Sequence, residues 1–232
     1  LSLRDLIVVG VGAVGSAALR AASELGANVL GIELHAPAHA CGSSHGLSRI
    51  FRHAYFEHPD YVPLLRHSTA RFESLEKESG ARLLHRCGML VMGDSGSATV
   101  SGSLASARRW NLPVDGLDAA ALRARFPWFS VADDAIGAFE ANAGIVRPEA
   151  TVHAAVAVGR ARGAELRVSS RVRSIVEDDA GVTVETDEGP ERAAAVIVAA
   201  GAWTSRLIPE LAPLLTVTRQ VQAWFVPTAG TD

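Results

Sequence analysis

The sequence has few cysteines, no excess of charge of one sign and no long apolar run. Cys41 and Cys87 are its only cysteines among 232 residues, and they form neither a CxxC pair nor a zinc spacing. We therefore expect free thiols in a cytoplasmic protein, with a single disulfide as the alternative. The formal net charge of -3 argues against a nucleic-acid partner, because phosphate binding requires a basic face. No apolar stretch reaches the roughly 18 residues of a membrane span, so no membrane partner is expected.

The two ends of the sequence predict a piece of a longer protein. The chain begins at Leu1 without an initiator methionine and ends at Asp232 in a polar stretch. No signal peptide is expected, because glycines interrupt the first apolar run. The hydrophobic content of 48% is sufficient for a sizeable core in one or two domains.

A glycine-rich turn between a buried strand and a helix is the first motif. A strand is expected at residues 6–9, a helix at 13–25 and a second strand at 29–32, which together form a βαβ unit with parallel strands. The turn matches GxGxxG, whose glycines permit a tight turn, close approach of a pyrophosphate and close packing of helix on strand. The free N–H groups of the helix would bind the phosphates. The residues expected there are Gly10, Gly12, Ala13, Val14 and Gly15.

Glu33 follows the second strand at about the spacing expected of a ribose-binding acid. Its carboxylate would accept hydrogen bonds from ribose hydroxyls and would repel a 2′-phosphate, which disfavours NADP. The turn, the helix and the acid together favour dinucleotide binding over a turn that only packs a helix. They leave FAD and NAD open.

Residues 42–55 combine small residues, histidines and arginines. If residues 45–52 are helical, His45, Arg49 and Arg52 share one face and would attract an anion such as a carboxylate. On spacing alone, a solvated basic face is the preferred interpretation. A metal site is a second alternative, but no zinc motif matches and no metal is expected. The histidines considered for it are His35, His39, His45, His53 and His58.

The rest of the pattern predicts an α/β fold. A hairpin is expected at residues 178–181. Helices are expected at residues 60–79, 102–110, 118–125 and 148–162. Strands are expected at residues 90–92, 166–168, 172–176, 182–186, 194–200 and 220–226.

The stretch from Gly42 to Tyr55, together with Val196 to Ser205, resembles the monomeric sarcosine oxidase and N-methyltryptophan oxidase family of FAD-dependent amino-acid oxidases. The similarity covers essentially the whole chain as the N-terminal part of such an enzyme. Residues 42–55 are more specific than the glycine turn, and they decide for FAD over NAD.

The resemblance implies a role for each residue of a cofactor site. The glycine turn would hold the FAD pyrophosphate, and Glu33 the adenosine ribose. Ser43, Ser44 and Arg49 would lie against the flavin end. The backbone of Val172 would meet the adenine, and Ala200, Gly201 and Trp203 would close over the cofactor.

The resemblance also implies the chemistry. Arg52 would bind the substrate carboxylate, whereas His45 and Arg49 would be catalytic residues near the flavin. A secondary amino acid would be oxidised at the carbon next to nitrogen, and O2 would accept the electrons to give H2O2. Sarcosine, N-methyltryptophan, pipecolate and fructosyl amino acids are candidate substrates. The full-length protein would be a monomer.

The implied fold is a Rossmann-like FAD-binding domain interleaved with part of an antiparallel-sheet substrate domain. The expected bounds are 1–82 and 146–214 for the FAD-binding domain, and 83–145 and 215–232 for the incomplete substrate domain. By the same resemblance, the cysteine that attaches flavin and the lysine that activates oxygen in this family would lie beyond residue 232, and Ser44 stands where relatives often have histidine. An NAD-linked dehydrogenase and a non-catalytic FAD-binding fragment are the alternatives.

Overall fold

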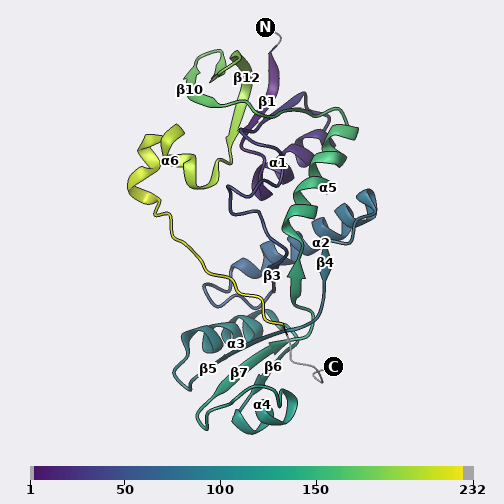
Figure 1. Cartoon of the computed structure of the whole chain (residues 1–232), viewed down its shortest axis with the longest axis vertical. Coiled ribbons are helices and arrows are strands. Elements are labelled where there is room, and N and C mark those ends of the chain that lie inside the picture. Colours follow the sequence, from purple (N-terminus) through teal and green to yellow (C-terminus); the bar gives the residue numbers. More distant parts are fainter. Residues whose placement is uncertain (1–2, 227–232) are drawn as a thin grey trace. The chain divides into compact units, whose positions relative to one another are not determined.

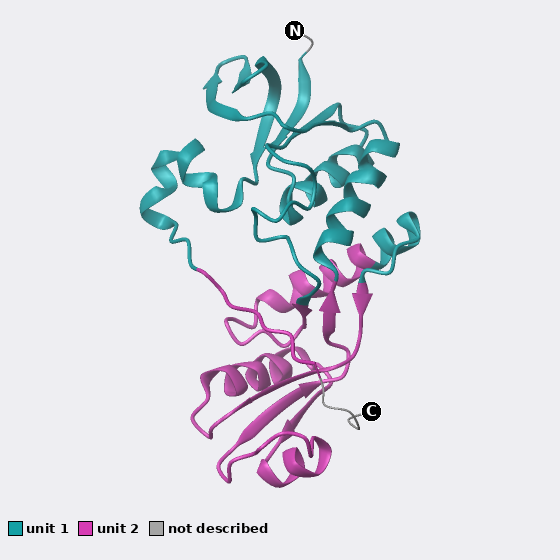
Figure 2. Ribbon diagram, viewed as in Figure 1, with its two compact units in different colours: residues 1–49, 73–83, 147–218 teal, residues 50–72, 84–146, 219–232 magenta. Residues whose placement is uncertain are grey.

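The computed structural model describes residues 3–226 and divides the chain into two compact units (Figure 2). Unit 1 comprises residues 1–49, 73–83 and 147–218, and unit 2 comprises residues 50–72, 84–146 and 219–232. Residues 50–72 thus group with unit 2, whereas the sequence analysis placed residues 1–82 in one domain. The assignment of FAD and substrate to the two units stays a prediction.

Unit 1 is built on a six-stranded sheet in the order β10-β11-β12-β1-β2-β9. Figure 1 labels β1, β10 and β12 of this sheet. Strand β1 pairs in parallel with β2 and with β12, and β2 pairs in parallel with β9. The expected hairpin is confirmed, since β10, β11 and β12 form an antiparallel meander. The strands are β1 (Arg4–Val9), β2 (Val29–Ile32), β9 (Glu165–Arg167), β10 (Val172–Asp178), β11 (Gly181–Thr186) and β12 (Gly189–Val198).

Two helices, α1 (Ala13–Glu24) and α5 (Pro148–Ala161), pack side by side on this sheet (Figure 1). The two helices approach closely at Gly159, where a Cβ would lie 3.5 Å from the Cα of Arg20, in ordinary van der Waals contact. The apolar residues of β1 alternate between two cores, as expected for a strand that is covered on both faces. One core contains Val8, Val11, Leu19, Ala22, Val29, Val152, Val156 and Ala164, and the other contains Ile7, Val9, Leu30, Ile32, Val182, Val184 and Ala193.

Short helices follow β12 in unit 1, and α2 (Tyr61–Ser79) runs from unit 2 into unit 1. The short helices are η1 (Gly201–Trp203), α6 (Thr204–Leu207) and η2 (Pro209–Leu214).

Unit 2 contains two three-stranded sheets, in the orders β5-β7-β6 and β3-β8-β4. The first is antiparallel and packs against two helices, α3 (Ala98–Trp110) and α4 (Ala119–Arg125). The strands are β3 (Arg49–Phe51), β4 (Leu84–His85), β5 (Met89–Gly93), β6 (Val114–Leu117), β7 (Ile136–Glu140) and β8 (Gly144–Val146). The expected fold class, α/β with an antiparallel second sheet, is confirmed.

Three local predictions differ from the structure. Helix α3 begins at Ala98 rather than at residue 102, because the Ser97 side chain caps it by accepting a hydrogen bond from Val100 N. Residues 45–52 are not helical, since Arg49–Phe51 form β3 beside β8. The strand expected at 220–226 is wrong: residues 215–226 have no regular secondary structure and their side chains are exposed.

No helix within residues 3–226 combines the length and apolar character needed to cross a membrane.

Replacement of Leu19 should weaken unit 1. Leu19 is fully buried between sheet and helices, so Leu19→Ala should lower the free energy of unfolding by about 2–5 kcal/mol. Leu25→Ala is the matched control, because Leu25 ends the same helix and is 87% exposed; its effect should stay within about 0.5 kcal/mol. Urea unfolding followed by circular dichroism measures both, and equal losses would contradict this packing.

Candidate functional site

The glycine turn has no space for side chains at two of its positions. Gly10 has a φ of +85°, and a Cβ there would lie 2.7 Å from the carbonyl oxygen of Ala199. A Cβ on Gly15 would lie 1.8 Å from the carbonyl oxygen of Gly10. Glycine is therefore required at both positions, at the first by conformation and at both by contact.

The N-terminus of α1 is suited to bind an anion. Gly12 is the N-cap, so no side chain caps the helix there, and the first turn contains no acidic residue. Ser44 lies at this point and accepts a hydrogen bond from Ala13 N at 2.9 Å. A pyrophosphate would therefore meet backbone N–H groups, the positive end of the helix dipole and a hydroxyl.

Glu33 lies at the carboxyl end of β2 and is 7% exposed. One carboxylate oxygen accepts a hydrogen bond from Val11 N at 2.7 Å, and the other accepts from His35 N at 3.1 Å. His39 Nε2 lies 3.4 Å from that second oxygen. Glu33 is thus fixed beside the glycine turn, where its remaining lone-pair positions can accept from ribose hydroxyls.

Arg49 organises the loop at residues 43–48 through backbone carbonyls. Its guanidinium donates to the carbonyl oxygens of Ser43, His45 and Ser48 at 2.9, 2.6 and 2.7 Å. The His45 ring lies against the Gly42 carbonyl oxygen. His45, Arg49 and Arg52 therefore do not share one face of a helix. The three carbonyl contacts of Arg49 give it a structural role in the loop.

The loop is also tied to α5. Glu149, in the first turn of that helix, accepts a hydrogen bond from Gly46 N at 2.7 Å. This bond brings residues 43–46 and the N-terminus of α5 into one unit with the glycine turn.

The remaining predicted cofactor residues lie on the same unit. Ala199 N donates to Val9 O at 2.8 Å, so Ala200 and Gly201 follow β12 directly beside the glycine turn. Trp203 ends η1 and is 39% exposed. Val172 opens β10, two residues after Ser170, whose N–H donates to the carbonyl oxygen of Glu33 at 3.1 Å.

These residues fit FAD. The helix N-terminus, the buried acid and the loop meet at the carboxyl ends of parallel strands, which is the usual dinucleotide position of such sheets. A Cβ on the central glycine, Gly12, would lie 3.2 Å from the Ser44 hydroxyl, a tight contact that would make this side chain shift.

Arg52 lies in unit 2, at the end of β3, and its side chain is 14% exposed. One guanidinium nitrogen contacts both carboxylate oxygens of Glu57, at 3.1 and 3.2 Å. The guanidinium carbon lies 4.7 Å from the ring centre of Tyr55 and 5.2 Å from that of Phe56. Two aromatic faces and one carboxylate thus hold a cation that is largely removed from water.

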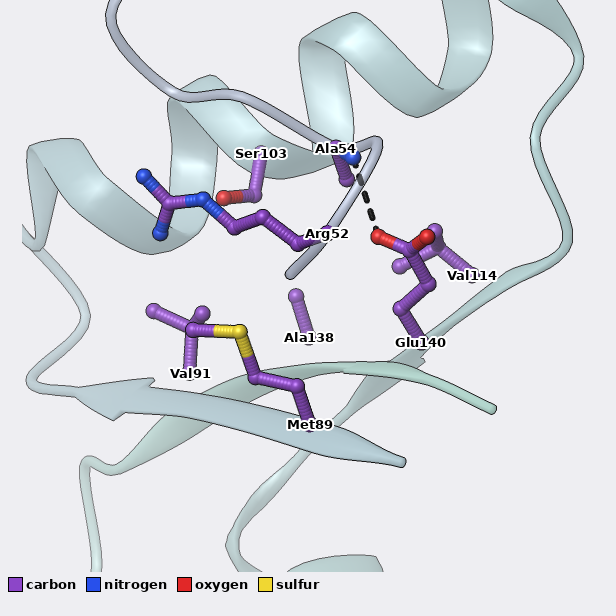
Figure 3. A pocket seen from close by; sticks show the side chains of 8 residues that line it. All are labelled: Arg52, Ala54, Met89, Val91, Ser103, Val114, Ala138 and Glu140. Carbon is purple, nitrogen blue, oxygen red and sulfur yellow. Dashed lines mark hydrogen bonds between the residues drawn. The ribbon is translucent and has the colours of Figure 1, made fainter. Parts of the chain in front are cut away.

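A small pocket in unit 2 is lined by Arg52 and Glu140 together (Figure 3). Met89 and Val91 of β5 and Ser103 of α3 form other parts of its wall. The pocket thus combines a cation and a carboxylate with apolar side chains.

Glu140 ends β7 and its side chain is 7% exposed. It accepts hydrogen bonds from His53 N at 3.0 Å, Ala54 N at 2.9 Å and His53 Nδ1 at 2.8 Å. Burial raises the pKa of the Glu140 carboxyl, but the hydrogen bonds and the nearby His53 ring outweigh burial and hold the pKa below its ordinary value. Glu140 is therefore a buried, hydrogen-bonded carboxylate.

Sequence reasoning missed Glu57 and Glu140. Glu57 is five residues from Arg52, and this spacing brings the two side chains together only on the loop path that the folded chain takes. Glu140 left one signal, since a single acid ends the apolar run Ala135–Phe139.

Three possible metal ligands do come together in unit 1. One donor atom from each of His35, His39 and Cys41 lies within 4.8 Å of the others. Both ring nitrogens of His39 already face other groups, since Nδ1 accepts from Cys41 N at 3.1 Å and Nε2 faces Glu33. In this arrangement His39 has no ring nitrogen left for a metal, and the expectation of no metal stays a prediction.

Gly15→Ala should reduce FAD retention. The added methyl group would collide with the Gly10 carbonyl and would displace the N-terminus of α1 from the turn. The absorbance ratio at 450 and 280 nm of the complete, purified protein should fall by at least about tenfold, in line with misplacement of binding groups. Gly96→Ala is the control, because its Cβ would meet only Asp94 at 3.5 Å; equal flavin content in both variants would contradict the role of the turn.

Glu140 should make the protein sensitive to acid. A carboxyl whose pKa is lowered on folding stabilises the fold above its unfolded-chain pKa of about 4.3, and this contribution is lost as the pH falls through the lower folded pKa. Glu140→Gln should cost about 1–3 kcal/mol at pH 7, because one of the two acceptor oxygens becomes an NH2 group that cannot accept from the surrounding donors. It should also lose less further stability between pH 6 and pH 3 than the wild type. Parallel pH dependences in urea unfolding would contradict the prediction.

The comparisons with known proteins agree with this geometry. Monomeric sarcosine oxidase of Streptomyces avermitilis is 41% identical over 226 residues, which are 97% of this chain and 59% of that protein. N-methyl-L-tryptophan oxidase of Salmonella typhimurium is 39% identical over 221 residues, which are 95% of this chain and 59% of that protein. The resemblance inferred from the sequence is confirmed, and this chain spans about 59% of the length of these relatives.

Solved structures show the same fold. NikD, an unusual amino acid oxidase essential for nikkomycin biosynthesis, superposes with a TM-score of 0.81 at 30% identity, covering 91% of this chain and 54% of that one. Glycine oxidase of Geobacillus kaustophilus superposes with a TM-score of 0.75 at 23% identity, a likeness in fold alone. Residues 5–232 match the family described as FAD dependent oxidoreductase. The chain therefore belongs to the FAD dependent oxidoreductase family.

Proposed function

We propose that the complete protein oxidises the C–N bond of a secondary, N-methyl amino acid such as sarcosine, with O2 as acceptor and H2O2 as product. The position of Arg52 is the observation that supports the substrate class, because a largely buried guanidinium beside a pocket is suited to bind a carboxylate. The relatives named for sarcosine and N-methyl-L-tryptophan oxidation support the same class.

In this proposal FAD, when bound, supplies the two-electron acceptor for amine oxidation. Unit 1 holds it through the glycine turn, Glu33 and the residues after β12. Arg49 keeps the loop at residues 43–48 in shape by its three carbonyl contacts and adds positive charge there. By the family resemblance, His45 of the same loop would lie near the flavin ring.

Arg52 binds and orients the substrate. One guanidinium nitrogen of Arg52 already contacts the Glu57 carboxylate. The same guanidinium is therefore suited to bind a carboxylate of the substrate. The apolar walls from Met89 and Val91 exclude water on one side and strengthen this ion pair. Arg52 thereby fixes the amino acid at its carboxylate end.

An NAD-linked dehydrogenase is not favoured, because the family and the specific stretch at residues 42–55 both point to FAD. The cytoplasmic location and the monomeric state of the complete protein stay predictions.

A peroxide assay on the complete gene product tests the function. Sarcosine, N-methyltryptophan, pipecolate and fructosyl amino acids are offered in turn, and H2O2 is measured with a coupled peroxidase. We expect peroxide from at least one N-methyl amino acid. A purified protein without a flavin spectrum would overturn the proposal, whereas flavin without peroxide from any substrate would indicate a non-catalytic FAD-binding protein.

Arg52→Ala should raise KM for carboxylate-bearing substrates on the order of 10- to 100-fold, because the substrate carboxylate loses its cationic partner. Arg66→Ala is the matched control: Arg66 is another arginine of unit 2, and it donates to Trp110 O at 2.9 Å outside the pocket. Steady-state kinetics measure both variants. An unchanged KM in Arg52→Ala would show that Arg52 does not bind the substrate carboxylate.

A further inference from the structure

Glu140 binds the chain at the two residues that follow Arg52. Its carboxylate accepts hydrogen bonds from His53 N and Ala54 N, at distances of 2.9–3.1 Å. The two residues are separated from Glu140 by more than 80 positions in the sequence. A single buried side chain thus accepts the backbone hydrogen bonds that a neighbouring strand would otherwise accept from this segment.

The His53 side chain reinforces this contact. Its Nδ1 donates to Glu140 Oε1 at 2.8 Å, and its Nε2 lies 2.8 Å from Thr69 Oγ1. The Thr69 hydroxyl also donates to Leu65 O at 2.9 Å, which fixes it on its own helix. Both ring nitrogens of His53 are therefore engaged, and the ring is held between Thr69 and the Glu140 carboxylate.

The backbone of Arg52 is consequently held on both sides. Before Arg52, β3 lies next to β8 in a sheet of unit 2; after Arg52, Glu140 holds two successive N–H groups. The direction of the Arg52 side chain depends on these two peptide planes, because the guanidinium extends from a Cα between them. Figure 3 shows the dashed contact from Ala54 to Glu140 beside the Arg52 side chain, which points along the pocket.

We propose that Glu140 and His53 are positioning residues for Arg52, which they hold in the orientation that receives the substrate carboxylate. This inference rests on the proposed function of Arg52. It assigns a kinetic role to a buried, hydrogen-bonded pair of side chains that need not touch the substrate. Its specific consequence is that loss of Glu140 weakens the binding only of substrates that carry a carboxylate.

The test uses the complete protein with FAD bound and three variants of unit 2. Glu140→Gln keeps the shape but has only one acceptor oxygen for its donors. Glu140→Asp restores the charge on a shorter side chain. Leu122→Ala is the control for general destabilisation, because Leu122 is fully buried among Ala119 and Ala135, in a separate cluster. Kinetics are measured with sarcosine and with its amide, which lacks the carboxylate.

We expect Glu140→Gln to raise KM for sarcosine on the order of 10- to 100-fold, as for a misplaced binding group, with kcat/KM for the amide changed less than about twofold. Glu140→Asp should restore part of the affinity for sarcosine. Leu122→Ala should affect the kinetics with sarcosine and with the amide equally. Equal losses on the two substrates, or the same pattern in Leu122→Ala, would assign Glu140 a merely structural role and overturn the proposal.

A second readout does not depend on catalysis. Phenylglyoxal modifies accessible arginines, and peptide mass spectrometry gives the rate at Arg52. We expect the rate to rise at least about fivefold in Glu140→Gln relative to wild type, and an unchanged rate would overturn the proposal. If the wild type oxidises neither sarcosine nor N-methyl-L-tryptophan, the proposed function fails, and the modification rates still decide the role of Glu140.

Discussion

The close approach of α1 to the turn that precedes it is the constraint on which unit 1 depends. The missing Cβ at Gly15 lets the helix start directly against the Gly10 carbonyl, and the missing Cβ at Gly10 lets β12 end beside the same turn. These two contacts place the N-terminus of α1 at the carboxyl edge of β1 and β12. The cofactor site is therefore a consequence of backbone packing before any side chain contributes to it.

Two buried carboxylates organise the two units in the same way. Glu33 accepts from Val11 N and His35 N, and Glu140 accepts from His53 N and Ala54 N. In each case an acid at the end of a strand satisfies backbone donors of a segment that has no strand partner at that point. Such charge-assisted bonds are stronger than bonds between neutral groups, which allows irregular segments to be held in one conformation.

Local chemistry made much of unit 1 predictable. The β-branched run before Gly10, the GxGxxG spacing and the hairpin at residues 178–181 each specify structure within a few residues, and the structure bears them out. Unit 2 was less predictable, because β3, β4 and β8 are two or three residues long and carry no periodic pattern. The contact between Glu140 and His53 spans 87 positions, so only the folded chain brings it about. Arg52 was identified through family resemblance, since its spacing from His45 and Arg49 suggested a helix that does not form.

The partners of Glu33 also bear on how the protein acquires its cofactor. Because backbone N–H groups and His39 surround this carboxylate within the protein itself, its rotamer is already restricted when ribose hydroxyls arrive. Side-chain entropy that would otherwise be lost on association has been lost during folding. In the proposed site, FAD would then bind to a folded chain, and its adenosine half would meet a surface that has little left to rearrange.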